Sequence, residues 1–321
     1  METQEAKEKH VYDLIILGAG PAGLAAGIYA GRYLLDTLII EKAQDGGQIT
    51  LTSEIENYPG QRFDIKETGL TLAARMTEQV AKFGALRVSA DIVKAELTGD
   101  VKKLTASDGT VYEAKTVILA NGAHYRPIGC VNEDKFRGAG ISFCATCDAN
   151  FFRGLDVYVV GGGDSAVEEA IYLTKFAKRV VIIHRRDELR AVASTQQRAF
   201  ANPKISFLWD SVVTEASGTD VLDSITVKNV KTGEETVIKA DPADGMIGLF
   251  GFLGMLPNTD IFADSGIELE HGYIKAGEDT HTNLPGVFAA GDIRTKTLRQ
   301  VVTACADGAV AAQEAEKYLA G

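Results

Sequence analysis

The chain has 321 residues, a formal net charge of −11 and 33 glycines, in an otherwise ordinary globular composition. Its length is enough for about two domains, each with a core of its own. The acidic balance argues against nucleic acid or an anionic membrane surface as the main partner.

Two further features of the composition narrow the class of protein. The first ten residues are polar, so they do not predict a signal peptide, and the longest apolar run, residues 246–256, is too short to span a bilayer. Four cysteines in a chain of this length do not predict a disulfide scaffold. Together these features favour a cytosolic enzyme, with no membrane span.

The first predicted element group is a buried strand, a glycine-rich turn, a helix and a second strand. These elements are residues 11–17, 18–23, 24–33 and 37–40. The turn carries the G-x-G-x-x-G pattern in its proper setting. Gly18 permits a tight turn, Gly20 lets a pyrophosphate approach the backbone, and Gly23 lets helix and sheet pack closely. The phosphates would lie at the helix N-terminus, and Glu41 would bind a ribose hydroxyl pair.

The next part of the chain predicts loops, one helix and several strands. Loop-like segments at residues 46–49 and 56–60 are able to cradle a ring system or to form ordinary turns. The remaining predicted elements are a helix at 65–84, a strand at 87–93, a hairpin turning at Asp108-Gly109 and a strand at 116–120. Residues 121–123 end that last strand in a glycine turn, where we expect the chain to leave the domain.

Cys144 and Cys147 are separated by two residues, a spacing that allows a small disulfide or half of a metal site. The other cysteines, Cys130 and Cys305, are isolated and no histidine pair is nearby, so the sequence predicts no metal. Asp148 directly follows the pair, and a carboxylate there can shuttle the proton that thiol–disulfide exchange needs. The pattern therefore favours a redox-active dithiol.

A second strand–turn–helix–strand group follows the dithiol. Its elements are residues 155–160, 161–166, 167–177 and 180–183. The same offset of 143 residues separates Gly18 from Gly161, Gly20 from Gly163 and Gly23 from Ala166. The match in register predicts a second dinucleotide site.

The residue that corresponds to Glu41 in the second group is His184, followed by Arg185 and Arg186, with Arg190 a helical turn further on. An acid at this position selects a free 2′-hydroxyl, whereas a cationic cluster selects a 2′-phosphate. The second site is therefore predicted to prefer NADPH over NADH. The alternative is that these arginines form an ordinary solvated face.

The C-terminal part predicts strands over residues 204–239, a buried strand over 246–256, and a short strand within 282–292 that ends in Gly291-Asp292. An aspartate at such a strand end can accept a hydrogen bond from a sugar-alcohol hydroxyl. A long helix follows, opened by Arg299-Gln300 and running to Leu319. These residues must complete the first group, because the second already has its own strands and helix. The second domain is therefore predicted to be inserted into the first.

These motifs, in this order, resemble the low-molecular-weight, bacterial-type flavin thioredoxin reductases over nearly the whole chain. The resemblance implies an α/β fold of two Rossmann-like, three-layer nucleotide-binding domains: residues 1–122 and 253–321 for FAD, and the inserted residues 123–252 for NADPH and the dithiol. The residues it implies for FAD are Gly18, Gly20, Pro21, Ala22, Gly23, Glu41, Lys42, Gly47, Gln48, Asn57, Gly122, Gly291, Asp292, Arg299, Gln300 and Val301. Those for NADPH are Gly161, Gly163, Asp164, Ser165, Ala166, His184, Arg185, Arg186 and Arg190.

The same resemblance implies a cytoplasmic homodimer with thioredoxin as its protein substrate. It implies that Cys147 lies next to the flavin, that Cys144 attacks the thioredoxin disulfide, and that Asp148 serves as acid or base. The inserted domain would rotate between the two half-reactions. Departures from the family pattern are Asn121, Ala149 and the segment that begins at Cys130. Two alternatives stay open: a reductase of the same fold with another donor, such as ferredoxin, or another dithiol substrate, and a non-enzymatic flavin or NADPH sensor.

Overall fold

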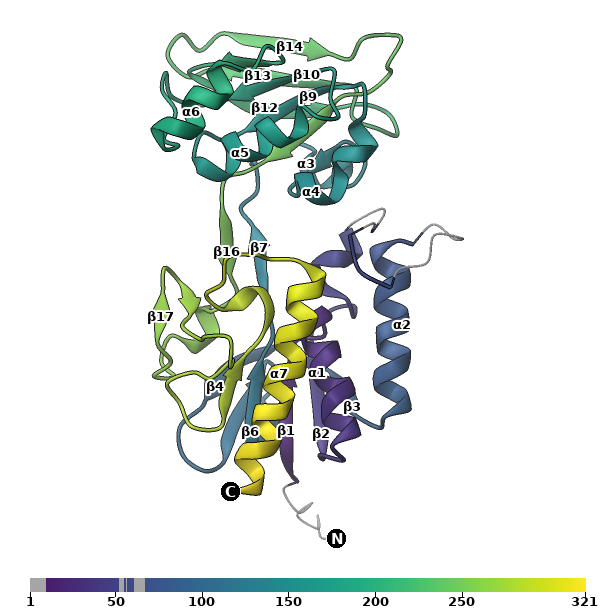
Figure 1. Ribbon diagram of the computed structural model, residues 1–321, viewed down its shortest axis with the longest axis vertical. Helices are drawn as coiled ribbons and strands as arrows, with labels where there is room; N and C mark the ends of the chain where they lie inside the picture. The colour runs from purple at the N-terminus through teal and green to yellow at the C-terminus, as the bar shows by residue number, and fades with distance from the viewer. Residues whose placement is uncertain (1–9, 52–54, 56, 61–66) are drawn as a thin grey trace, which may run out of the picture. The chain divides into compact units, whose positions relative to one another are not determined.

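The computed structural model of the chain describes residues 10–51, 55, 57–60 and 67–321, which form two compact units (Figure 1). The first unit contains Tyr58–His124, Pro257–Gly321 and the N-terminal segment up to Thr50. The second contains Tyr125–Leu256, and the described residues Leu51, Ile55 and Asn57 group with it. The sequence of the second unit therefore lies inside that of the first. Both units are α/β, with the Rossmann-like arrangement of parallel strands and covering helices.

A seven-stranded sheet forms the centre of the first unit, in the order β3-β2-β1-β6-β5-β4 with β19 paired to β6. Strands β3, β2, β1, β6 and β19 are parallel, whereas β5 and β4 are antiparallel additions. The strands are β1 (Val11–Leu17), β2 (Thr37–Glu41), β3 (Leu86–Ser89), β4 (Ile92–Glu96), β5 (Lys102–Ala106), β6 (Val111–Leu119) and β19 (Val287–Ala289). The runs of Ile and Leu in β1 and β2 suit strands that are covered on both faces.

Three helices lie side by side in the first unit: α1 (Pro21–Arg32), α2 (Gly69–Lys82) and α7 (Val301–Ala320) (Figure 1). Helices α1 and α7 approach closely because their contact is made of small residues. A Cβ added to Gly308 of α7 would lie only 2.0 Å from the carbonyl oxygen of Ala22 in α1. The opposite face of the sheet is covered by a segment with η3 (Asp260–Phe262), β17 (Leu269–Glu270), β18 (Tyr273–Ile274) and η4 (Gly291–Ile293).

The second unit has three layers around a parallel sheet in the order β11-β10-β9-β15-β8. One buried cluster joins this sheet to helices α4, α5 and α6, and another joins it to the antiparallel sheet β12-β13-β14. The helices are α3 (Glu133–Phe136), α4 (Ala145–Asp148), η2 (Ala149–Phe152), α5 (Asp164–Leu173) and α6 (Ala193–Phe200). The strands are β8 (Ile141–Ser142), β9 (Asp156–Val160), β10 (Arg179–Ile183), β11 (Ile205–Leu208), β12 (Ser211–Ser217), β13 (Ser224–Asn229), β14 (Glu235–Lys239) and β15 (Gly248–Gly251).

The chain passes between the units along two short strands, β7 (Ala123–Tyr125) and β16 (Met255–Pro257), which pair with each other (Figure 1). Next to them, the side-chain amide of Asn121 donates to the carbonyl oxygen of Asn258 at 2.9 Å, and that of Asn258 donates to the carbonyl oxygen of Asn121 at 2.6 Å. These bonds give Asn121, a departure from the family pattern, a definite structural role. The two segments that connect the units are therefore joined to each other by backbone and side-chain hydrogen bonds.

Two predicted strands differ from the structure. The single strand expected at residues 87–93 is wrong, because the segment contains parts of β3 and β4, which lie at opposite edges of the sheet. The strand expected at residues 246–256 is divided into β15 and β16, since Gly254 has a positive φ of 99° that ends regular pairing. The loop residue Glu56 and the first two residues of the helix predicted at 65–84 lie outside the described residues. The part of that helix that is described runs from Gly69 to Lys82.

Candidate active site

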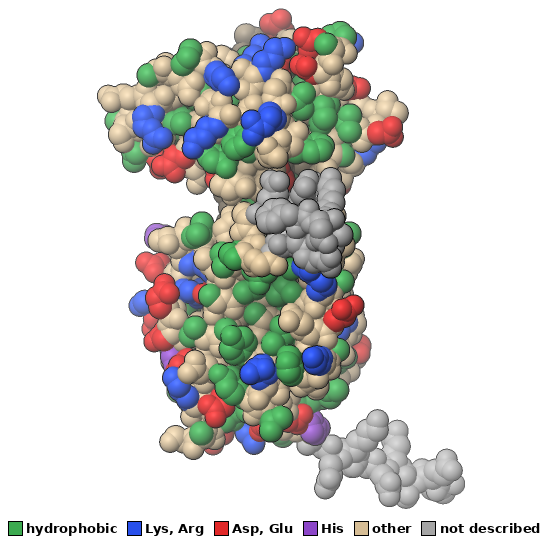
Figure 2. Space-filling view, turned by 45° about the vertical axis from the view of Figure 1, so that its right-hand side comes forward, with side chains coloured by type: hydrophobic (Ala, Val, Ile, Leu, Met, Phe, Trp, Pro, Cys, Tyr) green, Lys and Arg blue, Asp and Glu red, His purple; other side chains and the backbone are tan. Residues whose placement is uncertain are grey.

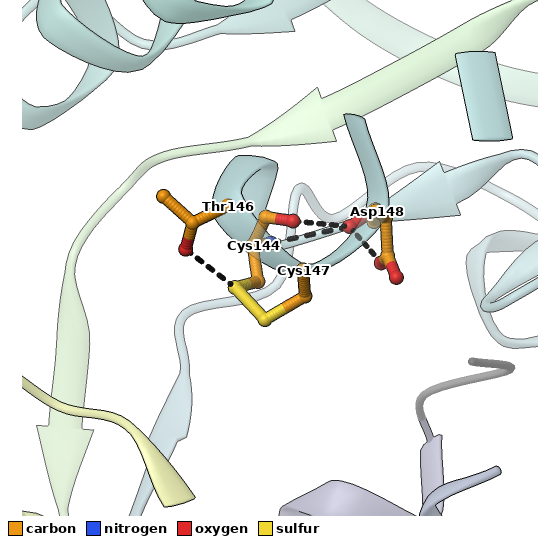
Figure 3. Close-up of a disulfide and its surroundings, with 5 residues drawn as sticks. Cys144, Thr146, Cys147 and Asp148 are labelled. Atoms are coloured by element: carbon orange, nitrogen blue, oxygen red, sulfur yellow. Dashed lines mark hydrogen bonds between the residues drawn. A yellow bond between two sulfur atoms is a disulfide. The ribbon is translucent and has the colours of Figure 1, made fainter. Parts of the chain in front are cut away.

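Cys144 and Cys147 are joined by a disulfide, with their Cα atoms 5.3 Å apart (Figure 3). Cys144 stands just before the single turn of α4, and Cys147 lies within that turn. Both residues are partly exposed, as a dithiol that exchanges with another protein must be. Ala149, the second departure from the family pattern, has ordinary helical backbone angles (φ −55°, ψ −36°) and so causes no strain.

Asp148 lies at the end of the same turn and is held by a buried serine. The hydroxyl of Ser142 donates to Oδ2 of Asp148 at 2.6 Å and accepts the backbone N–H of Cys144 at 3.1 Å (Figure 3). Burial raises the pKa of Asp148, and the hydrogen bond from Ser142 offsets part of that rise. A carboxyl group with a raised pKa is closer to the condition in which it both takes up and gives up a proton at neutral pH.

The other two cysteines are poor nucleophiles. Cys130 is buried, and burial raises its pKa to about 11, with a further contribution from Glu133. Cys305 is partly exposed and lies on α7, where its thiol faces the carbonyl oxygen of Pro21 at 3.8 Å, and burial raises its pKa as well. Both thiols are therefore protonated at neutral pH. The Cys144–Cys147 pair is better suited to thiol–disulfide exchange.

The first glycine turn (residues 18–23) has the geometry that its sequence predicts. Gly18 has φ +110°, and a Cβ there would lie 2.5 Å from the carbonyl oxygen of Ala120. A Cβ on Gly23 would lie 1.9 Å from the carbonyl oxygen of Gly18, so strand and helix meet without a side chain between them. A Cβ on Gly20, in contrast, would meet no atom of the described residues closer than 4.0 Å. The second glycine therefore borders open space at the N-terminus of α1, as a bound pyrophosphate requires.

Of the other residues predicted for FAD, Glu41 and Gly47 contact this turn. The carboxylate of Glu41 accepts the backbone N–H groups of Ala19 and Ala43, both at 2.9 Å. Gly47 faces Gly20, since a Cβ on it would lie 3.5 Å from the Cα of Gly20. Pro21 and Ala22 open α1, and Gly122 follows β6 with φ +63°. Gln48 donates to the carbonyl oxygen of Ala123, Lys42 lies 3.8 Å from Asp91 at the surface, and Asn57 is exposed.

The C-terminal segment brings buried polar atoms without partners to the first unit. Oδ1 of Asp292 and Nε of Arg299 are both buried, and neither has a hydrogen-bond partner among the described residues. Burial raises the pKa of Asp292, partly offset by the positive charges of Lys296 and Arg299. Gln300 precedes α7 and Val301 begins it. Because buried polar atoms normally find a partner, these two atoms fit a site for a polar ligand such as the ribityl chain of a flavin.

Sequence reasoning missed the ion cluster that supports Asp292. The carboxylate of Asp307 in α7 accepts from Arg294 at 2.7 and 2.8 Å, from Lys296 at 2.8 Å and from the backbone N–H of Gly291 at 2.9 Å. These contacts fix the turn that carries Asp292 to the helix beside it. The signal in the sequence was an acid within an apolar helix, which indicates a buried and paired charge.

The second glycine turn (residues 161–166) repeats the first with one change. Gly161 has φ +147°, and a Cβ there would lie 2.6 Å from the carbonyl oxygen of Phe252. Gly163 borders open space, since the nearest atom that a Cβ on it would meet, within the part of the chain that the structure describes, is Arg190 Nη2 at 3.9 Å. At the third position, Ala166 packs its methyl group into the core. Asp164 and Ser165 are exposed in the first turn of α5, and Asp164 accepts the backbone N–H of Val192 at 2.7 Å.

The basic cluster (His184, Arg185, Arg186 and Arg190) lies beside the second glycine turn. The His184 ring is buried where Gly162 has no side chain, with its atoms 2.5–2.6 Å from the position a Cβ would take. The three arginines are exposed, and no ion pair is found for them among the described residues. Figure 2 shows that Lys and Arg side chains gather on a face of the unit that holds α5 and α6. Exposed guanidinium groups without acidic partners are suited to bind a phosphate.

The dithiol and the second glycine turn belong to one compact unit. Strands β8, β15 and β9 are mutually parallel, so the residues that follow β8 and β9 lie at the same edge of the sheet. Ala145 of α4 belongs to the same buried cluster as Ala166 and Val167 of α5. The second glycine turn and the disulfide are thus carried together by the second unit.

Neither a metal site nor a membrane span was found in the described part of the chain. Among those residues, no group of three or more His, Cys, Asp or Glu side chains could hold a metal ion. None of the helices described has the length and apolar character needed to cross a bilayer.

Comparisons with known proteins agree with this geometry. A family profile described as "Pyridine nucleotide-disulphide oxidoreductase" matches residues 12–308. The chain is 51% identical to a thioredoxin reductase of Peptoclostridium acidaminophilum, over 97% of this chain and 98% of that one. It is 45% identical to a thioredoxin reductase of Bacillus subtilis, over 97% and 96% of the two chains. The crystal structure of thioredoxin reductase from Streptococcus pyogenes superposes with a TM-score of 0.89 at 46% identity, covering 97% and 98% of the two chains.

The fold and the profile define the class: the protein is an oxidoreductase that works with a flavin and a nicotinamide nucleotide on a disulfide. The relatives named above are 45–51% identical and match over nearly the whole of both chains, so they show the family within this class. The chain belongs to the thioredoxin reductase family.

Proposed function

We propose that the protein reduces thioredoxin with electrons from NADPH, with FAD bound by the first unit and NADPH by the second. The observation that carries this proposal is that the Cys144–Cys147 disulfide lies in the same unit as the basic cluster, whose three arginines have no ion pair among the described residues. The names of the relatives support thioredoxin as the substrate.

The described residues fit FAD in the first unit. The open space at Gly20 suits the pyrophosphate, Glu41 suits the ribose of the adenosine, and the unpartnered Oδ1 of Asp292 suits a ribityl hydroxyl. Gly163 offers the same kind of space in the second unit, and Arg185, Arg186 and Arg190 supply charge for the 2′-phosphate of NADPH.

When bound, the flavin supplies two-electron chemistry between the nicotinamide and the disulfide. The protein's part is to bring two groups to one flavin in turn, because the dithiol and the second nucleotide site belong to one unit and the flavin site to the other. We infer that the second unit rotates about the paired strands β7 and β16, which connect the units at both crossings.

Within the second unit, Cys144 and Cys147 divide the exchange between them. Cys144 attacks the thioredoxin disulfide, and Cys147 then attacks the sulfur of Cys144, releases the substrate and closes the disulfide again. Asp148 gives its proton to the departing substrate sulfur and then takes up the thiol proton of Cys147. Its raised pKa suits both transfers.

The proposal is tested by stopped-flow reduction of the purified flavoprotein with NADPH and with NADH, followed by NADPH oxidation linked to thioredoxin. Loss of flavin absorbance that is fast with NADPH and slow with NADH, with thioredoxin-dependent turnover, is the expected result. Fast reduction by both nucleotides would contradict the role of the basic cluster. Rapid flavin reduction without thioredoxin turnover would point to another dithiol protein as the substrate.

We also infer a homodimer and a cytoplasmic location, in which a working dithiol can be cycled. Light scattering of the purified protein would measure the oligomeric state, and a monomer at micromolar concentration would contradict it. Cell fractionation would check the location.

A further inference from the structure

The hydroxyl group of Ser142 is a buried side-chain group of the dithiol region that the exchange chemistry has not yet used. It lies at the end of β8, and Ser142 is only 5% exposed. Its Oγ is 2.6 Å from Oδ2 of Asp148, 3.1 Å from the backbone nitrogen of Cys144 and 3.4 Å from the carbonyl oxygen of Cys144 (Figure 3). The carbonyl of Cys144 in turn accepts the backbone N–H of Asp148 at 3.1 Å. Serine, acid and attacking cysteine thus form one closed hydrogen-bonded group.

A hydroxyl group is able to serve a carboxyl group in both of its protonation states, because it has one proton to donate and two lone pairs that accept. When Asp148 is ionised, Ser142 donates to it and accepts the N–H of Cys144. When Asp148 is protonated, its own O–H can donate to Ser142, whose proton then turns to the carbonyl oxygen of Cys144. Neither state leaves a buried polar atom of this group without a partner, so proton gain and loss at Asp148 requires only a hydroxyl rotation.

We propose that Ser142 is a positioning residue for thiol–disulfide exchange, which holds the carboxyl group of Asp148 in place beside the dithiol through both halves of the proton transfer. The inference rests on the proposed function, in which Asp148 is the acid and base. It adds a role for Ser142 to that function, and the hydrogen bonds of Ser142 are those described above.

Protons and electrons balance in the exchange between the reduced dithiol and thioredoxin. The thiolate of Cys144 forms a bond to one thioredoxin sulfur while the thioredoxin S–S bond breaks, and the departing sulfur takes the proton held by Asp148. The thiol of Cys147 gives its proton to the Asp148 carboxylate and attacks Cys144, which breaks the mixed disulfide and releases the second thioredoxin sulfur. Two electrons pass from the dithiol to the substrate, and Asp148 ends as it began, one proton having moved from Cys147 to the substrate.

The first experiment is a pH profile of the Ser142→Ala holoenzyme, reduced with NADPH and mixed with oxidised thioredoxin in single-turnover mode. Loss of a hydrogen bond that favours the carboxylate raises the pKa of Asp148 further. We expect the limb of the profile that reports Asp148 to move to higher pH and exchange at neutral pH to slow by about three- to tenfold, the effect of one hydrogen bond. Flavin reduction by NADPH should be unchanged, since Ser142 takes no part in it.

A matched control separates positioning from simple loss of a buried hydroxyl. Ser224 is also buried, 8% exposed, lies in the same unit and donates to its neighbour Asp223 at 2.7 Å. Ser224→Ala should leave the exchange profile as in the unmodified enzyme. An equal shift in both variants would overturn the inference, because the effect would then belong to the stability of the unit.

A double-mutant cycle with Asp148→Asn tests whether Ser142 acts through the acid. Asp148→Asn alone should slow exchange by about 10²–10⁴. Adding Ser142→Ala to that variant should cause no further loss, whereas independent effects would multiply, and multiplication would overturn the inference. If Asp148→Asn leaves exchange unchanged, the acid–base role in the proposed function itself fails. If Asp148→Asn is slow but Ser142→Ala keeps the original pH profile, only the inference about Ser142 fails.

Discussion

The two nucleotide-binding units share one strand–turn–helix design but differ in what surrounds the turn. In the first unit, the C-terminal segment adds η4 and α7 beside the turn. Two polar atoms there, Asp292 Oδ1 and Arg299 Nε, are buried and have no partner among the described residues. In the second unit, the arginines of the basic cluster are exposed at the surface. The polar atoms that distinguish the first site are thus buried, and the arginines that distinguish the second are solvated.

This difference matches two different tasks. A buried site with unpartnered polar atoms gains much from a ligand and releases it slowly, which suits a flavin that stays bound through many turnovers. Exposed cations attract an anionic ligand but hold it only moderately in water, which suits a nicotinamide nucleotide that must leave after each hydride transfer. The same turn can therefore serve a resident cofactor or an exchanging one, according to what covers it.

Loss of the dithiol should have the largest effect, because it stops disulfide reduction and leaves flavin reduction in place. Cys144→Ser or Cys147→Ser should lower thioredoxin-linked NADPH oxidation by more than about 10³-fold, as loss of a catalytic nucleophile does. Flavin reduction by NADPH needs neither sulfur and should stay nearly intact. Steady-state turnover and stopped-flow flavin reduction are measured on each variant, with Cys130→Ser as the control of full activity. Substantial turnover in either dithiol variant would show that these cysteines do not carry the electrons to thioredoxin.

The next effect tests the third position of each turn, where the units differ by one methyl group. Gly23→Ala places a Cβ 1.9 Å from the carbonyl oxygen of Gly18, which strand and helix can accommodate only by moving apart. Because the clash is with backbone, we expect a loss of stability of about 3 kcal/mol or more, at or above the top of the usual overpacking range, and a low flavin-to-protein ratio. Ala166→Gly in the second unit removes a methyl group and should cost only about 1 kcal/mol. Urea unfolding and the flavin content of the purified variants are the measurements, and equal losses would contradict the comparison.

The sequence predicts best those elements whose contacts are local in the chain. The glycine turns, the matched register of the two units and the dithiol are encoded within short segments, so their elements were predicted to within a few residues. The placement of β3 and β4 at opposite edges of one sheet depends on pairing with distant strands. No alternation of side chains within residues 87–93 carries that information.

The candidate site shows the same limit. Gly291-Asp292 was recognised as a strand end, but its attachment to Asp307 joins residues 13 to 16 positions apart through a buried carboxylate. Ser142 was missed for a similar reason, since a lone serine two residues before a cysteine has no distinguishing pattern in one sequence. Its role became visible only once the turn of α4 brought Asp148 back to 2.6 Å from its hydroxyl.

A smaller effect is expected when the charge difference between the units is reduced. Arg185→Gln and Arg186→Gln each remove a charge-assisted contact to a 2′-phosphate, worth about 1.5–3 kcal/mol. The ratio of kcat/KM for NADPH over NADH should fall about tenfold or more for each residue. Arg198→Gln changes an exposed arginine on α6, outside the basic cluster, and should leave the ratio as it is. An unchanged ratio in the first two variants would make these arginines an ordinary solvated face.

The smallest effect concerns the protonation of His184, the counterpart of Glu41. Burial lowers the pKa of His184, and the positive charges of Arg190, Arg186 and Arg185 lower it further. Arg190→Gln removes one of these charges and should therefore raise the pKa of His184, whereas Arg198→Gln should not move it. An NMR titration of the His184 ring in the two variants measures the difference.

The sign of the linked stability change follows from the direction of the shift. Because the pKa of His184 is lower in the folded protein than in an unfolded chain, folding favours the neutral ring. The stabilisation from this group is fully present above the ordinary histidine pKa of about 6.5 and is lost as the pH falls from there through the lowered folded-state value. Arg190→Gln, which moves the two values closer together, should lose less stability over that pH interval than Arg198→Gln does. Urea unfolding of both variants at the two ends of the interval would show this, and parallel losses would mean that Arg190 does not act on His184.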